Sequence, residues 1–155
     1  MGCDACGHTG TSGRILVAGD GPGRYRARDE LTYLASPYSA PAGTPEPDAG
    51  ILRDARFKAV AHVAARMMAR GVLLYCPITH THPIAMAGEL PTDFGFWERY
   101  GRRLLLSCDS VTVLCLDGWR ESEGVTAEIA LARELGLPVR FVDEDGAPVL
   151  AAGER

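Results

Sequence analysis

One glutamate occupies an unusual position for a charged side chain. In the segment GWRESEGVTAEIALA, at 118–132, Val125, Ile129 and Ala132 recur with i, i+4, i+7 spacing and predict the buried stripe of a helix. Glu128 lies beside this stripe, although a glutamate is seldom placed against a core unless it is paired or used. The positive end of the helix dipole favours its ionised form, and such a carboxylate can attack an anomeric carbon. The alternative is a first-turn glutamate that only complements the dipole.

The start of the same helix carries a serine and a glycine. Ser122 and Gly124 can form a turn that directs backbone N–H groups toward a phosphate. A simple N-cap serine explains the same pattern equally well. The sequence leaves both interpretations open.

Two histidine-containing motifs raise the question of a metal. His80 and His82 are separated by one residue between prolines, and without a third ligand His80 is better interpreted as lining a pocket. Cys3, Cys6 and His8 provide half of a zinc site, but no second CxxC or HxxxH pair follows. A tail with incidental cysteines is the preferred interpretation, and we predict neither a metal nor another cofactor.

Several aromatic and hydroxyl-bearing side chains are further candidates for contacts to a ligand. Trp119 follows an apolar run and can cover a flat ligand, whereas the pattern around Trp97 favours core packing. Asp109 precedes the same apolar run, where it can also pair with a neighbour or cap a turn. The hydroxyl-bearing candidates are Tyr33, Tyr38 and Ser39.

Bulk composition limits the possible classes of function. The 155 residues suffice for one compact domain, and 46% hydrophobic with 23% charged residues is ordinary for a soluble protein. A net charge of -4 argues against binding to nucleic acid polymers. Neither a membrane-spanning run nor a signal peptide is visible, so we expect a cytoplasmic protein with reduced cysteines.

Strands and helices are expected to alternate along the chain after a flexible or irregular segment at 1–30. We predict strands at 31–36, 72–78, 111–116 and 138–142. Helices are predicted at 51–70, at 93–107 and from the residue after Gly124 to 136. A long loop is expected at 79–93 and a turn or hairpin at 143–150. This order predicts an α/β domain at 31–155 with a three-layer, flavodoxin-like parallel sheet of four to five strands and helices on both faces.

The polar loops of this arrangement converge on one edge of the sheet. SPYS follows the first strand, THTH the second and DGWRESEG the third. Ligands bind at the carboxyl ends of the strands in such sheets, so we expect a pocket there.

The order and spacing of these segments resemble a known family. YLASPYS, CPITHTHPIA, DFGFW and CDSVTVLCLDGWRESEGVTAEIALA are similar, over 31–142, to bacterial and phage domains that resemble nucleoside 2-deoxyribosyltransferases and 2'-deoxynucleoside 5'-monophosphate N-glycosidases. The resemblance implies a flavodoxin-like fold, dimers or larger homo-oligomers, and Glu128 as the nucleophile. In the hydrolases SxGxxxE binds phosphate, which here implies Ser122 and Gly124. The resemblance also implies a sugar and base pocket lined by Tyr33, Ser36, Pro37 and Tyr38. Our further candidates for substrate binding are Ser39, Arg56, His80, Trp97, Asp109 and Trp119.

One position departs from the family pattern. The hydrolases carry an aspartate eight positions before the acidic residue that opens the third strand, and counting back from Asp109 gives Gly101. Glu98, or less favourably Asp93, would have to protonate the leaving base instead.

From Glu128 and the resemblance together, we predict cleavage or transfer at the N-glycosidic bond of a nucleoside or its 5'-monophosphate. The alternative is a nucleotide-binding or sensing module of the same fold that has lost turnover.

Overall fold

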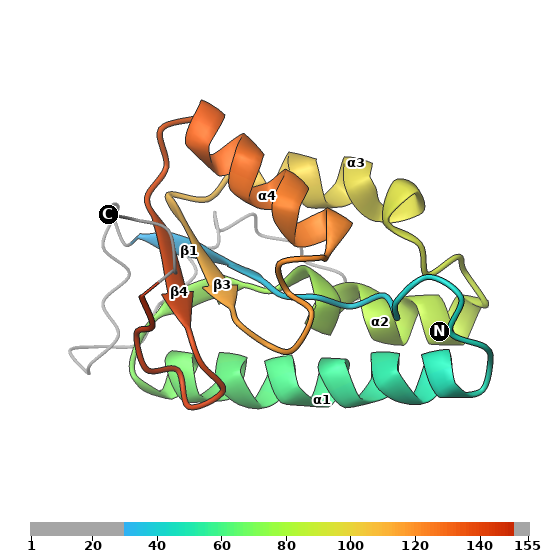
Figure 1. Cartoon of the computed structure of the whole chain (residues 1–155). Coiled ribbons are helices and arrows are strands. Elements are labelled where there is room, and N and C mark those ends of the chain that lie inside the picture. Colours follow the sequence, from blue (N-terminus) through green and yellow to red (C-terminus); the bar gives the residue numbers. More distant parts are fainter. Residues whose placement is uncertain (1–29, 151–155) are drawn as a thin grey trace, which may run out of the picture.

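A single parallel sheet organises the domain. The computed structural model describes residues 30–150 and has strand order β2-β1-β3-β4, with every neighbouring pair parallel (Figure 1). The strands are β1 (Leu31–Ala35), β2 (Leu73–Tyr75), β3 (Ser110–Leu114) and β4 (Val139–Val142). The helices are α1 (Asp48–Ala69), α2 (Pro77–Gly88), α3 (Phe94–Leu105) and α4 (Glu123–Glu134). The predicted three-layer, Rossmann-like α/β fold is confirmed, with four strands in the described residues.

Alternation along the strands builds a separate core on each face of the sheet. Leu34 and Leu114 point to the face covered by α1, where they pack with Val60. Tyr33 and Val113 point to the opposite face, covered by α3 and α4 (Figure 1). Both central strands, β1 and β3, are therefore buried on two sides, as their apolar sequences require.

Two helices begin with side-chain caps. Asp93 Oδ1 accepts a hydrogen bond from Phe96 N at 3.0 Å, and Ser122 Oγ accepts one from Val125 N at 3.4 Å. These caps satisfy backbone N–H groups that a helix start leaves without partners. Both lie at the carboxyl edge of the sheet, so they also fix where α3 and α4 enter the candidate site.

The prediction of a loop at 79–93 is wrong, because most of this segment forms α2. Pro77 begins this helix after the extended Cys76, where the missing N–H of proline costs nothing. Pro83 lies inside the helix, where a proline costs about 3 kcal/mol. Packing against α1 offsets that cost: Ile78, His82 and Ala85 are all buried, at i, i+4, i+7 spacing.

The remaining expectations concern the chain ends and the cysteines. Val142 and Pro148 form an antiparallel bridge, which confirms the predicted terminal turn. Cys76, Cys108 and Cys115 are free thiols. Cys3, Cys6 and His8 lie outside the described residues. No helix within 30–150 combines the length and the apolar character needed to cross a membrane.

Candidate functional site

A pocket of about 130 Å³ opens at the carboxyl edge of the sheet, on the side of α3 and α4. It lies where β1 has β2 on one side and β3 on the other, which is the switch point at which open parallel sheets bind ligands. Predicted site residues in its wall are Tyr33, Ser36, Tyr38, Ser39, Asp93, Trp97, Glu98, Ser122, Gly124 and Glu128. The predicted position of the pocket is therefore the observed one.

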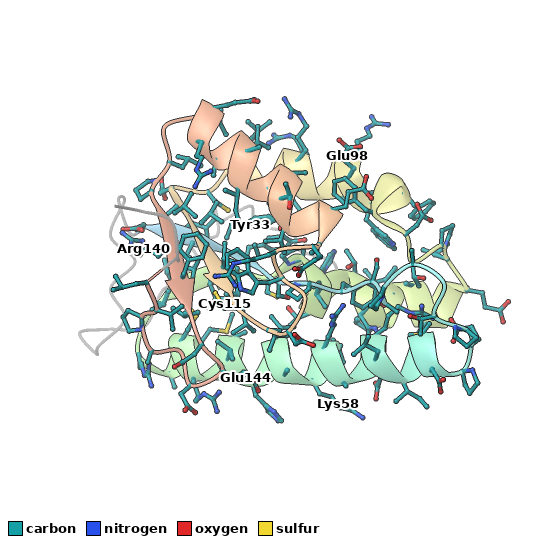
Figure 2. The ribbon with its side chains drawn as sticks, viewed as in Figure 1. Tyr33, Lys58, Glu98, Cys115, Arg140 and Glu144 are labelled. Carbon is teal, nitrogen blue, oxygen red and sulfur yellow. The ribbon has the colours of Figure 1, made fainter. Side chains whose placement is uncertain are left out.

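A short hydrogen bond in this wall joins strand β1 to helix α4. The Tyr33 hydroxyl donates to Glu128 Oε1 at 2.6 Å. Tyr33 is fully buried at the middle of β1, whereas Glu128 lies in the second turn of α4 and is partly exposed to the pocket. Figure 2 shows Tyr33 between the sheet and the overlying helices, with Glu98 farther out on α3. The rigid strand thus holds the carboxylate in one orientation.

Burial controls the charge of this carboxylate. Removal from water raises the pKa of Glu128 to about 7, and the hydrogen bond from Tyr33 opposes that rise. The expectation that the helix dipole would hold Glu128 ionised is therefore corrected. Glu128 lies beyond the first turn of α4, where the dipole is weak, and desolvation outweighs it. At neutral pH the site holds a mixture of carboxylate and carboxylic acid.

Replacing Tyr33 by phenylalanine tests the role of this hydrogen bond. The change removes the donor that favours the ionised form, so the pKa of Glu128 should rise further. If ionised Glu128 is required, the acidic limb of the activity profile should move to higher pH by roughly one to two units. Initial rates of turnover from pH 5 to 9 measure this. Activity should largely recover at pH 9, and an unmoved limb would contradict the assigned role.

Gly101 on α3 lies directly over the pair. A Cβ atom added there would be 3.1 Å from the Tyr33 hydroxyl and 3.8 Å from Glu128 Oε1. The first distance is shorter than ordinary van der Waals contact, so only glycine fits without displacement. Position 101 is thus next to the carboxylate, and its lack of a side chain leaves room for the Tyr33 hydroxyl.

Two further hydroxyl groups of the pocket have no partner among the described residues. Ser36 Oγ and Tyr75 Oη are both buried without a hydrogen bond. Burial raises the pKa of Tyr75 to about 12, with nearby Cys76, Cys108 and Glu128 contributing, so its hydroxyl keeps its proton. Unpaired buried hydroxyls are costly, and a bound polar ligand would satisfy them.

The start of α4 supports both interpretations of Ser122. Its Oγ caps the helix through Val125 N, as the simpler alternative predicted. Ser122 and Gly124 also line the pocket, so the N-terminus of α4 adjoins the ligand space. A Cβ at Gly124 would be 3.3 Å from the Phe94 ring, so the glycine allows α3 to approach closely.

Five predicted residues do not line the pocket. Pro37 is fully buried, and His80 is exposed on α2. Asp109 lies at the amino end of β3, away from the carboxyl edge, where its Oδ2 accepts from Leu31 N at 2.8 Å. The remaining two residues, Arg56 and Trp119, have structural contacts instead.

Arg56 joins two loops by hydrogen bonds, and Trp119 packs against the core. The buried Arg56 guanidinium donates to the carbonyl oxygens of Ser39 at 2.6 Å and Asp117 at 2.8 Å, so it ties the loops after β1 and β3 together. Trp119 packs on Phe141, with ring centroids 5.3 Å apart. Both side chains therefore support the site from outside the pocket.

Sequence reasoning missed several pocket residues. Tyr75 ends β2 at the same edge as Tyr33, so the position of its strand would have revealed it. Pro77 and Ile78 begin α2, although the strand was predicted to run to 78, and Thr81 lies in the part of α2 that was predicted as a loop. The others are Thr92, Phe94, Tyr100, Arg102, Leu105, Ala127 and Leu131, from α3, α4 and the segment before α3.

The fold and the pocket define a Rossmann-like α/β domain with a ligand site at the carboxyl ends of its strands. Residues 30–144 match the domain of unknown function DUF1937, and the chain belongs to that family. No curated protein matches the chain. Between residues 30 and 150, no group of three or more His, Cys, Asp and Glu side chains is arranged to hold a metal ion.

Proposed function

We propose that this protein cleaves or transfers the N-glycosidic bond of a nucleoside or nucleoside 5'-monophosphate, using Glu128 as the nucleophile. The observation that carries the proposal is the Glu128 carboxylate in the pocket wall, oriented by the Tyr33 hydroxyl at 2.6 Å. The similarity of the sequence motifs to deoxyribosyltransferases and nucleotide N-glycosidases supports the same class of reaction.

The reaction divides into two displacements. Glu128 attacks the anomeric carbon; the bond from that carbon to the base nitrogen breaks, and the base leaves with the electron pair and takes up a proton. Glu98, which lines the pocket one turn before Gly101, is the proposed source of that proton. Water or a second base then attacks the glycosyl-enzyme and releases Glu128. The first partner yields hydrolysis and the second yields transfer.

The pocket wall offers binding groups for each part of such a substrate. The unpaired Ser36 and Tyr75 hydroxyls can bind sugar hydroxyl groups, which both donate and accept hydrogen bonds. The N-terminus of α4 with Ser122 suits a 5'-phosphate. The Trp97 and Tyr100 rings, with centroids 5.6 Å apart, offer apolar surface for the base.

Gly101→Ala tests whether the space over Glu128 matters. The new methyl group would press on the Tyr33 hydroxyl, which cannot retreat because Tyr33 is fully buried. Misplacement of the carboxylate should lower kcat/KM by up to about 10²-fold. The clash can offset the roughly 1 kcal/mol that alanine adds to helix stability, so urea unfolding of this variant and its control checks that the protein is folded in the assay. Gly88→Ala in α2 is the control, since its Cβ would meet only the flexible Leu90 side chain; equal activity of both variants would contradict the argument.

A chromatographic screen for free base tests the proposal directly. The full chain is incubated with ribo- and deoxyribonucleosides and their 5'-monophosphates, with and without an acceptor base. Release from at least one substrate, absent with Glu128→Gln, is the expected result. Release that persists in Glu128→Gln would overturn the mechanism.

The second candidate is a nucleotide-binding module without turnover. The glycine at position 101 favours it, because no acidic side chain reaches Glu128 from that position. Calorimetric binding of a nucleotide, with no base release on prolonged incubation, would select this function.

A further inference from the structure

A buried histidine of α2 contacts the pocket residue Tyr38, and the proposed reaction does not use it. His82 of α2 is only 8% exposed and stacks on Phe57 of α1, with ring centroids 4.2 Å apart at an interplanar angle of 17°. A buried imidazole needs partners for its nitrogen atoms. From the sequence we interpreted the neighbouring His80 as the pocket histidine, but His80 is exposed and His82 is buried.

Both ring nitrogens of His82 face polar groups. The Tyr38 hydroxyl is 2.9 Å from Nδ1, and Asp54 Oδ1 of α1 is 4.0 Å from Nε2. The carboxylate favours a proton on Nε2, which leaves a lone pair on Nδ1. The Tyr38 hydroxyl must then donate its proton to Nδ1.

This direction of donation determines what Tyr38 can offer a ligand. Tyr38 lines the pocket and is partly exposed. A phenol has one proton, and with Nε2 of His82 protonated the 2.9 Å contact commits that proton to Nδ1. The Tyr38 oxygen can then only accept a hydrogen bond from a ligand.

We propose that His82 is a positioning residue for the pocket, which holds Tyr38 as a hydrogen-bond acceptor and so selects ligands that present an N–H or O–H donor there. That the ligand is a nucleoside or nucleotide rests on the proposed function. The orientation of the Tyr38 hydroxyl does not, because it follows from contacts within the protein.

The groups around His82 keep it neutral at neutral pH. Burial lowers its pKa below the ordinary 6.5, Asp54 raises it, and Arg53 lowers it. Lys58 Nζ lies 2.5 Å from Asp54 Oδ2 and weakens the influence of that carboxylate. Protonation below this pKa places a proton on Nδ1, so the Tyr38 hydroxyl must reverse and donate elsewhere. Ligand binding should therefore weaken as the pH falls through the pKa of His82.

Nuclear magnetic resonance of the full chain tests the hydrogen-bond direction without any ligand. Long-range ¹H–¹⁵N spectra should show neutral His82 with its proton on Nε2. Tyr38→Phe should raise the pKa of His82, because the lost hydrogen bond stabilises the neutral ring. The exposed His62 is the internal reference and should not change. A proton on Nδ1, or a titration unaltered by Tyr38→Phe, would overturn the proposal.

The pH dependence of affinity for an uncharged nucleoside tests the consequence, because a 5'-phosphate would itself titrate near pH 6. Protonation of Glu128 comes at a higher pH, near 7; below it, wild-type affinity should weaken in a lower step as the pH falls through the pKa of His82. His82→Asn places an acceptor that does not titrate near the Nδ1 position, so it should abolish the lower step. That step is expected to be roughly three- to tenfold, the effect of one neutral hydrogen bond. His62→Asn is the matched control and should retain the lower step.

The two hypotheses fail in different ways. A lower step that survives in His82→Asn would overturn the role of His82 even if base release is observed. If no nucleoside or nucleotide binds or reacts, the proposed function fails, and the tautomer measurement still decides the direction of the Tyr38 hydrogen bond.

Discussion

Replacement of Glu128 by glutamine should abolish base release and leave a folded protein that is more stable than the wild type above pH 7. An amide cannot attack the anomeric carbon, so kcat should fall by about 10⁴-fold or more, the scale of losing a catalytic nucleophile. Glutamine can still accept the hydrogen bond from Tyr33, so the local geometry should persist. Steady-state assays with the substrate identified in the base-release screen measure the loss.

The gain in stability follows from the raised pKa of Glu128. The pKa of Glu128 is about 7 in the folded protein and 4.5 for an ordinary glutamate, so the unfolded chain releases this proton at lower pH. Stability is therefore lost as the pH rises from 4.5 to 7, by at most about 3 kcal/mol. Glutamine has no such dependence.

Urea unfolding at pH 4 and pH 8 separates the two effects. The free energies of unfolding of wild type and Glu128→Gln should differ little at pH 4, and the variant should be the more stable at pH 8. A variant that is destabilised at both values would attribute the loss of activity to misfolding. Retained activity in a folded variant would remove Glu128 from the mechanism.

The parts of the site that depend on periodicity were predictable from the sequence. The i, i+4, i+7 stripe of Val125, Ile129 and Ala132 placed Glu128 on a helix beside the core. The alternation of strands and helices then fixed the edge of the sheet at which the pocket lies. Local pattern was sufficient here because both predictions depend only on the spacing of apolar residues and on the order of strands and helices along the chain.

The parts that depend on tertiary contacts were not predictable in the same way. Trp119 turned away from the pocket because the chain reverses at Gly118, whose φ of 79° no local pattern indicates. The charge of Glu128 depends on burial, which outweighs the helix dipole that the sequence suggested. In α2 the prolines concealed a regular buried stripe, so His82 was passed over.

Glu98→Gln should slow cleavage by roughly 10²–10⁴-fold for a base that needs protonation to leave. Glu98 lines the pocket from α3 and is exposed, and its carboxylate has no hydrogen-bond partner within residues 30–150. Asp93 also lines the pocket, but its Oδ1 is engaged as the cap of α3.

The leaving group provides the decisive comparison. A nucleoside whose base carries a positive charge leaves without protonation, so Glu98→Gln should cleave it at nearly the wild-type rate. Asp93→Asn keeps a capping oxygen and should retain most of the activity toward both substrates. If Asp93→Asn, and not Glu98→Gln, lost activity toward the ordinary base, Asp93 would be the acid. Full activity of both variants toward the ordinary base would mean that neither carboxyl supplies the proton.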